Sequence, residues 1–356
     1  MPVEPTPAIS VIVPVYNGAE SLERCLEAVL ASDGASYECI VVNDGSTDGS
    51  RTIAAEFPMP VRVVDIADGP RGPAHARNRG AELARGEILF FIDADVVLAP
   101  GALQRLANTF SQRPALAAVF GSYDATPTAT GLVSQYRNLL HHFVHQNGNP
   151  DASTFWAGCG AIRKEVFDRV GGFDARRFPR PSIEDIELGY RLKALGCLIL
   201  LDKELQATHL KRWTFYSMIR TDVVCRALPW SRLILQTRNM PADLNLKVGQ
   251  RASFVLAVFA CVSLGLSAAR LEWLGASAAS ILGVVVLNRN LYTFFFRRRG
   301  VLFASACVGL HLLYYLYSGL SYLYARAGFE FNRALSFGRN SALRQRVFSR
   351  AASRNK

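Results

Sequence analysis

The chain has 356 residues, a formal net charge of +11, and a hydrophobic content of 50% that gives a mean hydropathy of +0.14. The length allows about two domains with one large core, and no internal repeat or low-complexity segment is present. The seven cysteines show no C-x-x-C pair or metal-ligand spacing, so they are expected to be reduced and mostly buried. The basic charge suits an anionic lipid surface. Nucleic acid is the competing partner, but no nucleic-acid-binding module accompanies the charge, so none is expected.

The first hundred residues alternate between strand, loop and helix patterns. A first strand is predicted within residues 9–18, before an amphipathic helix that begins near Ala19. A second strand, residues 37–43, precedes Asp44-Gly45-Ser46-Thr47-Asp48, where oxygen-bearing side chains and a glycine suit contact with a nucleoside. A third, residues 61–66, precedes the arginine-rich stretch 71–80. The alternation predicts a doubly wound, mostly parallel α/β sheet with its ligand site at the carboxyl edge.

The most informative motif is Asp93-Ala94-Asp95, which directly follows the apolar run 87–92. Hard divalent cations are commonly held by one or two carboxylates together with substrate phosphates. The motif therefore indicates a clamp for a metal-bound nucleoside diphosphate. Taken singly, a D-x-D is as often a solvated loop, 44–48 could be a turn with a helix cap, and the arginines could be a solvated helix face. Their joint order and spacing argue against those interpretations.

These motifs resemble those of glycosyltransferase family 2, the inverting nucleotide-sugar transferases with the GT-A fold. V-I-V-P-V-Y-N, V-V-N-D-G-S-T-D, A-R-N-R-G and F-I-D-A-D match its nucleotide-binding half in order. W-A-G-C-G-A-I-R-K with G-G-F-D, and then I-E-D-I-E-L-G-Y-R, match its acceptor half. The resemblance covers roughly residues 9–212.

The resemblance implies a role for each matching residue. Asp44 would contact the base, Arg77 the diphosphate and Asp93 the ribose or metal region, while Asp95 would ligate the metal, Mn²⁺ or Mg²⁺. Asp185, beside Glu184, would be the catalytic base. The nucleotide-sugar site would also include Pro14, Tyr16, Asn17, Gly45, Ser46 and Ala94. The sugar and acceptor site would include Trp156, Gly158, Cys159, Gly160, Arg212 and Trp213.

The chemistry supports this interpretation independently. A leaving diphosphate needs a cation and positioned donors, and an acceptor hydroxyl needs a base within hydrogen-bond reach. Displacement in a single step inverts the anomeric carbon and requires no protein nucleophile. Glu184 and Asp185 begin a helical pattern, where acids also complement the helix dipole, and that structural role is an equal alternative without the resemblance.

His209 follows a predicted last strand, residues 197–201, and is expected to complete the metal shell, although a core or capping histidine is the alternative. Arg212-Trp213 is similar to the end of the Q-x-x-R-W signature of processive polysaccharide synthases. The glutamine position of that signature holds His209, so addition of one or a few sugars is favoured over processive synthesis.

Three uncharged runs follow the matched region: residues 252–269, 273–287 and 301–325, of 18, 15 and 25 residues. A membrane-spanning helix needs about 20 apolar residues, so the first and third qualify outright and the second only if it is extended. Between the two regions, residues 211–250 mix aromatic, apolar and arginine side chains, which predicts interfacial or domain-packing helices. No signal peptide is expected, because residues 1–8 are polar and proline-rich.

Arginines 297–299 lie between the second and third runs, and residues 326–356 carry eight Lys and Arg against Glu330. The positive-inside rule places both clusters in the cytoplasm, where nucleotide sugars also occur. Three full spans would send the tail outward, so two to three spans remain open.

We therefore expect a catalytic domain in residues 1–210, with halves 9–125 and 126–210, interface helices in 211–250, membrane helices in 251–325 and a basic cytoplasmic tail in 326–356. The expected function is metal-dependent, inverting transfer of a sugar from a nucleoside diphosphate, UDP by resemblance, to a hydroxyl of a lipid or lipid-linked glycan at the plasma membrane. The alternatives are a polyprenyl-phosphate glycosyl synthase and a non-catalytic nucleotide-sugar-binding scaffold.

Overall fold

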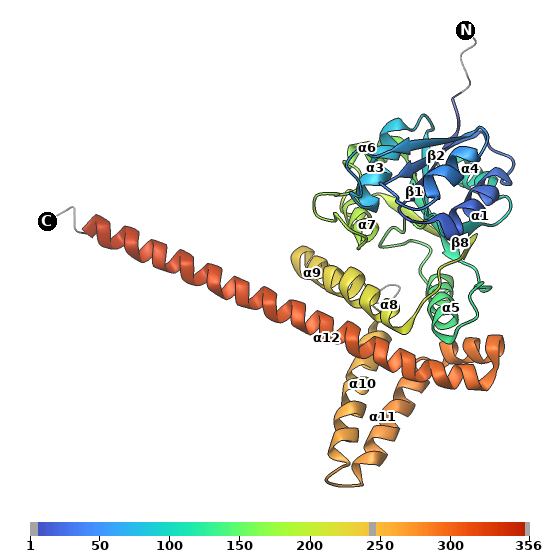
Figure 1. Ribbon diagram of the computed structural model, residues 1–356. Helices are drawn as coiled ribbons and strands as arrows, with labels where there is room; N and C mark the ends of the chain where they lie inside the picture. The colour runs from blue at the N-terminus through green and yellow to red at the C-terminus, as the bar shows by residue number, and fades with distance from the viewer. Residues whose placement is uncertain (1–5, 242–246, 353–356) are drawn as a thin grey trace.

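The computed structural model describes residues 6–241 and 247–352, with side chains up to Arg333. An eight-stranded mixed sheet with helices on both faces forms the upper part of the molecule, and helices alone form the lower part (Figure 1). The strands are β1 (Ile9–Val15), β2 (Tyr37–Asn43), β3 (Val61–Asp65), β4 (Ile88–Ile92), β5 (Val96–Leu98), β6 (Leu116–Tyr123), β7 (Cys159–Arg163) and β8 (Leu198–His209). The expected α/β class is confirmed.

The strand order is β3-β2-β1-β4-β7-β6-β8-β5. Strands β3, β2, β1 and β4 are parallel, so the loops after them open on one edge of the sheet. The sheet is mixed rather than uniformly parallel, because β7 pairs antiparallel with both β4 and β6. The short β5 pairs antiparallel with β8, which places Val96 opposite His209.

Both faces of the sheet are buried, which explains why the strands are nearly continuous hydrophobic runs. Apolar side chains of α1 (Ala19–Leu30) and α4 (Ala102–Gln112) pack on one face. Those of α3 (Pro73–Leu83), α6 (Lys164–Arg169) and α7 (Glu184–Ala194) pack on the other. Gly189 allows α7 to approach closely, because a Cβ there would lie 2.3 Å from the backbone nitrogen of Phe155. Helix α2 (Ser50–Glu56) follows β2.

The lower part is joined to the part that contains the sheet through α5 (Leu132–Gln146). Apolar side chains of α5 share a buried cluster with side chains of α8 (Phe215–Arg220) and α12 (Arg289–Ala352). Helix α8 continues into a seven-residue π-helix, η1 (Thr221–Ala227), and then into α9 (Leu228–Thr237).

Helices α10 (Val248–Leu266) and α11 (Trp273–Leu287) form an antiparallel hairpin that points away from the sheet (Figure 1). Helix α12 bends at Gly300, which has a φ of 82°, and then runs across the base of the hairpin rather than alongside it. By length and composition, α10 and the stretch Arg289–Arg333 could cross a membrane, whereas α11 is shorter.

Candidate active site

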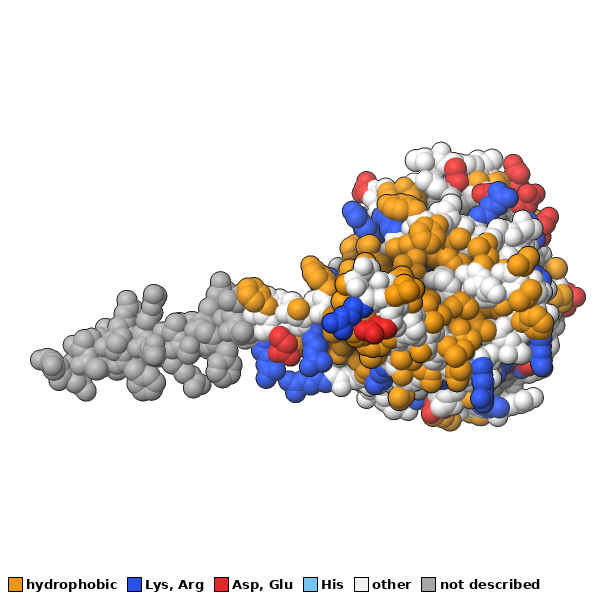
Figure 2. Space-filling view, turned by 90° about the horizontal axis from the view of Figure 1, so that it is seen from below, with side chains coloured by type: hydrophobic (Ala, Val, Ile, Leu, Met, Phe, Trp, Pro, Cys, Tyr) orange, Lys and Arg blue, Asp and Glu red, His pale blue; other side chains and the backbone are white. Residues whose placement is uncertain are grey.

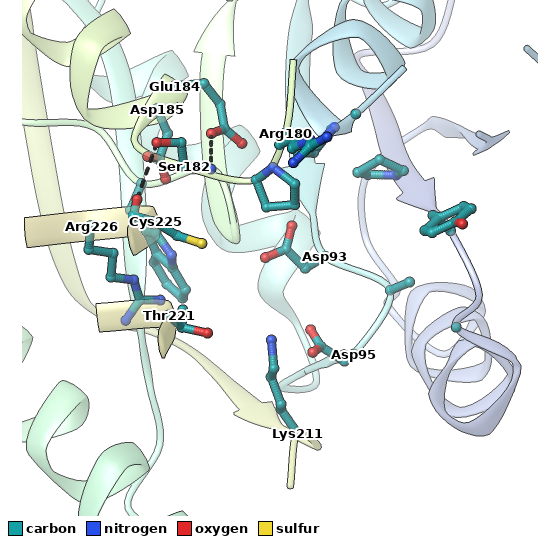
Figure 3. Close-up of a pocket in the computed structure, with 18 of the residues that line it drawn as sticks. Asp93, Asp95, Arg180, Ser182, Glu184, Asp185, Lys211, Thr221, Cys225 and Arg226 are labelled. Carbon is teal, nitrogen blue, oxygen red and sulfur yellow. Dashed lines mark hydrogen bonds between the residues drawn. The ribbon is translucent and has the colours of Figure 1, made fainter. Parts of the chain in front are cut away.

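A cleft of about 1700 Å³ lies at the carboxyl edge of the parallel strands. It is lined by the loops after β1, β2 and β4, by the start of α7, and by residues of α5, η1 and α9. The carboxylates of Asp93 and Asp95 both project into it, opposite the wall formed by η1 (Figure 3). The two acids that the sequence placed after one strand therefore face one cavity.

Arg77 connects the two halves of the cleft. Its Nη2 atom donates to Asp93 Oδ1 at 2.7 Å, and its Nη1 atom donates to Glu184 Oε1 at 2.8 Å. The side chains of Arg77 and Glu184 are each only 6% exposed. Burial by itself would lower the pKa of Arg77, but Asp93 and Glu184 outweigh it and raise that pKa. Arg77 lines the cleft as expected, with its guanidinium engaged by two carboxylates.

Asp185 presents a buried carboxylate to the cleft. Its oxygens accept hydrogen bonds from the backbone nitrogens of Ala157, at 3.1 Å, and Ile186, at 2.8 Å. Burial raises the pKa of Asp185 to about 7, with a further contribution from Glu184, while Arg77 acts in the opposite direction. A carboxyl group with a pKa near neutrality can accept a proton from a bound hydroxyl.

His209 and Asp95 form the pair that could hold a cation. His209 Nε2 lies 3.4 Å from Asp95 Oδ2, and His209 Nδ1 lies 2.7 Å from Asn138 Oδ1. If Nδ1 donates to the amide oxygen of Asn138, Nε2 carries a lone pair that faces the carboxylate of Asp95. Asn138 would then hold the His209 ring in an orientation that allows His209 and Asp95 to share a metal ion. When Nε2 is protonated instead, its hydrogen bond and charge, together with the charge of Lys211, lower the pKa of Asp95 against the effect of burial.

The donor set is small. Within the described part of the chain, no group of three or more His, Cys, Asp or Glu side chains could hold a metal. Two protein ligands fit a cation that also binds substrate phosphates, so His209 and Asp95 are compatible with such an ion and do not form a complete protein cage.

On the nucleotide side, Pro14, Tyr16, Asn17 and Ala94 line the cleft. Asp44 lines it too, but its carboxylate oxygens already accept from the backbone nitrogens of Arg71, at 2.8 Å, and Gly72, at 2.7 Å. Gly45 and Ser46 are not among the residues that line the cleft. Ser46 Oγ accepts from the nitrogen of Asn17, which ties the loop after β2 to the loop after β1.

On the acceptor side, Trp156 and Arg212 line the cleft. The absence of a side chain at Gly158 leaves room for the Trp156 ring, because a Cβ at Gly158 would lie 2.7 Å from that ring. A Cβ at Gly160 would lie 2.2 Å from the carbonyl oxygen of Trp156. Cys159 is fully buried in β7, and Trp213 is 7% exposed and packs beneath Arg137 and Lys211, so neither lines the cleft.

The sequence patterns did not single out several other residues of the cleft. Ser182 lies between α7 and η1, and Thr221, Cys225 and Arg226 of η1 form the opposite wall (Figure 3). Arg180 and Lys211 are further cations of the lining. The residues from Lys211 onward belong to the basic, aromatic segment 211–250, and that composition does not distinguish a cleft wall from a solvated helix face.

Comparison with known proteins agrees with this architecture. Residues 10–171 match the model of glycosyl transferase family 2. An uncharacterised glycosyltransferase of Nostoc is 30% identical over 199 residues, which cover 54% of this chain and 58% of that protein. Glycosyltransferase AglE of Haloferax volcanii is 39% identical over 109 residues, 30% of this chain and 36% of that protein.

Validoxylamine A glucosyltransferase of Streptomyces hygroscopicus is 29% identical over 231 residues, 56% of this chain and 54% of that protein. The chain thus matches between about a third and just over half the length of these relatives. Among solved structures, the mannosyltransferase PcManGT from Pyrobaculum calidifontis, in complex with GDP-Man and Mn²⁺, has a TM-score of 0.53 at 19% identity. The match covers 89% of this chain and 87% of the PcManGT chain. That likeness supports the GT-A fold.

The first testable prediction concerns the central ion pair. Replacing Arg77 with Met leaves the buried carboxylate of Glu184 without its cation, and removal of one partner of a buried pair typically costs ~3–5 kcal/mol. We expect the free energy of unfolding, measured by denaturant titration in detergent, to fall by about that amount. Arg79→Met is the matched control, since Arg79 lies on the same helix with its side chain 44% exposed. Equal stabilities of the two variants would contradict the assignment.

Proposed function

We propose that the protein is an inverting glycosyltransferase that moves a sugar from a nucleoside diphosphate donor to a hydroxyl of a lipid or lipid-linked glycan. The observation that carries the proposal is Asp185, a buried carboxylate with a pKa raised to about 7, in the same cleft as Asp93 and Asp95. In the reaction, the acceptor O–H bond and the bond between the anomeric carbon and the diphosphate oxygen break. A glycosidic bond forms, Asp185 takes the proton, and the nucleoside diphosphate leaves with the electron pair.

Asp95 and His209 would hold a divalent cation, which supplies positive charge for the leaving diphosphate. The positive charge of Arg77 offsets part of the negative charge of Asp93 and Glu184, which lowers their repulsion of the anionic donor. Asp44, fixed by two backbone nitrogens, would present its remaining lone pairs to the base. UDP is the nucleotide that the family resemblance suggests. Binding of GDP-mannose and Mn²⁺ by the structural neighbour makes a guanosine donor the second to test.

A polyprenyl-phosphate acceptor is the second candidate, and one observation favours it. Arg212 and Arg220 line the acceptor side of the cleft, and neither forms an ion pair with an acid among the described residues. Arg226 lines the same side and lies 3.5 Å from Asp222. Free guanidinium groups suit a phosphate. An acceptor phosphate is already ionised, however, and would not need Asp185.

We propose that the hairpin α10–α11 enters the membrane while α12 lies along the membrane surface. Large apolar side chains on the hairpin are exposed, among them Val255, Phe259, Val262, Leu274, Leu282 and Val286. Figure 2, seen from below, shows hydrophobic side chains over much of the face towards which the hairpin points, with arginine and lysine side chains at its margin. At about 1.5 Å per residue, the 15 residues of α11 are shorter than a ~30 Å hydrocarbon core. To span the bilayer fully, the hairpin would therefore need either a thinned bilayer or a contribution from the residues that flank α11.

This arrangement removes the conflict in the charge pattern. An antiparallel hairpin returns the chain to the side from which it entered, so arginines 297–299, the tail and the catalytic domain would share the cytoplasmic side. A spanning α12 would place the tail outside instead. Side chains are described only up to Arg333, so the placement of residues 334–356 on the cytoplasmic side rests on their sequence.

The second prediction tests the cation pair. Asp95→Ala removes one of two proposed ligands, so metal-dependent affinity for the nucleotide should fall by about tenfold or more. Calorimetry with UDP and GDP, with Mn²⁺ or with EDTA, measures it. Asp168→Ala is the control, since Asp168 is 56% exposed and pairs only with Lys164 on the surface. An affinity for the metal-bound nucleotide that is unchanged in Asp95→Ala would contradict the role of Asp95.

The third prediction separates the two acceptors. Asp185→Asn keeps the size of the side chain and removes its basicity, and a positioned base contributes about 10²–10⁴-fold in rate. If the acceptor is a hydroxyl, transfer to the native lipid fraction should fall by that factor while nucleotide affinity stays within about threefold. The wild-type kcat/KM should decline as the pH falls through about 7, because Asp185 then becomes protonated. Near-native transfer by Asp185→Asn would refute the base role and support a phosphate acceptor.

The fourth prediction tests the topology. With two membrane-entering helices, a cysteine at position 350 should resist a membrane-impermeant maleimide in intact cells and react only after permeabilisation. Replacing the exposed Cys261 with Ser removes background labelling. Labelling of position 350 in intact cells would require an odd number of crossings and would contradict the hairpin.

A further inference from the structure

Hydrogen bonds, joined by the backbone of η1 and of Ser182, connect α12 to the acids of the cleft. Tyr317, on α12, donates its hydroxyl to Asp222 Oδ2 at 2.6 Å. Asp222 belongs to η1 and is only 4% exposed, and its other oxygen lies 2.8 Å from Arg137 Nη2 on α5. Loss of Arg137 would remove the nearest positive charge from this buried carboxylate and leave only Arg226 of η1 itself, 3.5 Å away, while loss of the Tyr317 hydroxyl would remove its hydrogen-bond donor from α12. The position of η1 is thus fixed jointly by α5 and α12.

From η1 the path continues into the active site. The carbonyl oxygen of Cys225 accepts from the hydroxyl of Ser182 at 3.2 Å, and the backbone nitrogen of Ser182 donates to Glu184 Oε2 at 2.9 Å. Figure 3 shows both bonds at the cleft wall. Glu184 in turn holds Arg77 and is the acid that helps to raise the pKa of Asp185. A π-helix is rare and frequently marks a functional site, and here it carries the carbonyl group that Ser182 binds.

At its other side, α12 is bound to the hairpin. The hydroxyl of Tyr315 lies 2.8 Å from Asn288 Oδ1 and 2.9 Å from Gln250 Oε1, at the base of α10 and α11. Gly319 allows close packing, because a Cβ there would lie 2.2 Å from the ring of Phe254 on α10. Two tyrosines two residues apart therefore join α12 to the membrane hairpin on one side and to the cleft wall on the other.

We propose that Tyr317 is a positioning residue for catalysis: through Asp222, η1 and Ser182 it holds Glu184 and Arg77 in the arrangement that Asp185 needs. The position of α12 on the hairpin then sets the reactivity of the cleft, so that the enzyme is fully active only when its membrane helices are seated. The inference rests on the proposed glycosyl transfer, and it adds a route by which the membrane region controls that reaction.

The test is a double-mutant cycle between the two ends of the path, in the full chain reconstituted in phospholipid nanodiscs. Tyr317→Phe removes one hydroxyl and Ser182→Ala removes another, and Tyr324→Phe is the control, because Tyr324 lies on the same helix and is 69% exposed. We expect each single variant to lower kcat by about tenfold, as for a lost hydrogen bond to a charged or constrained group, with the donor KM within about twofold. The double variant should be no slower than the slower single variant. Additive effects, or an unchanged kcat in Ser182→Ala, would overturn the proposal.

Amide hydrogen exchange provides a readout that does not depend on activity. If the path is used, Tyr317→Phe should accelerate exchange in residues 180–185, more than a hundred positions away in sequence, and Tyr324→Phe should not. Protection of 180–185 that is unchanged in Tyr317→Phe would overturn the coupling. Should Tyr317→Phe fail to insert, Ser182→Ala alone decides the matter, because it leaves α12 untouched and must accelerate exchange in 221–227. If the wild type releases no nucleotide from any donor, the proposed function fails while the exchange experiment still decides the coupling.

Discussion

The buried guanidinium of Arg77 is the contact on which the arrangement of the cleft depends. It joins Asp93, at the end of β4, to Glu184, at the start of α7, and so couples the two halves of the sheet. Without this cation, three neighbouring carboxylates, including Asp185, would repel one another in a poorly solvated site. Burial raises the pKa of Asp185 to about 7, with Glu184 adding to the rise and Arg77 opposing it, and a carboxylate with such a pKa can serve as a base.

Much of this cleft is predictable from sequence because parallel strands end at a common edge. Asp44, Asp93 and Asp95 each follow a predicted strand, and all three line the cavity. His209, expected to complete the metal shell, lies beside Asp95 because β5 and β8 are neighbours in the sheet. A periodic pattern of hydrophobic residues predicts the local helix or strand, and the motif that resembles the family indicates which loop carries each functional side chain. The catalytic and ligand roles of these residues stay predictions.

What the sequence does not reveal are contacts between side chains far apart in the chain. Arg77 and Glu184 are 107 positions apart, and no spacing rule distinguishes a guanidinium that binds phosphate from one that binds acids of its own protein. The capture of Asp44 by the backbone at 71–72 likewise depends on how two loops meet. The apolar run of α12 predicts a helix but not its direction, which is set by the bend at Gly300 and by packing on α5 and η1.

In the proposed reaction, that direction would determine how an acceptor reaches Asp185. The face of α12 that contacts η1 lies behind the same wall that carries Thr221, Cys225 and Arg226 into the cleft, so the acceptor side of the cavity is built partly on a helix of the hydrophobic region. A detached catalytic domain would retain the strand-end acids but would lose this wall. If the hairpin enters a bilayer, the cleft opens close to the lipid surface, and a lipid-linked acceptor could enter while its apolar chain stays in the membrane. The wall then serves both as the acceptor surface and as the link by which the membrane region holds Glu184 in place.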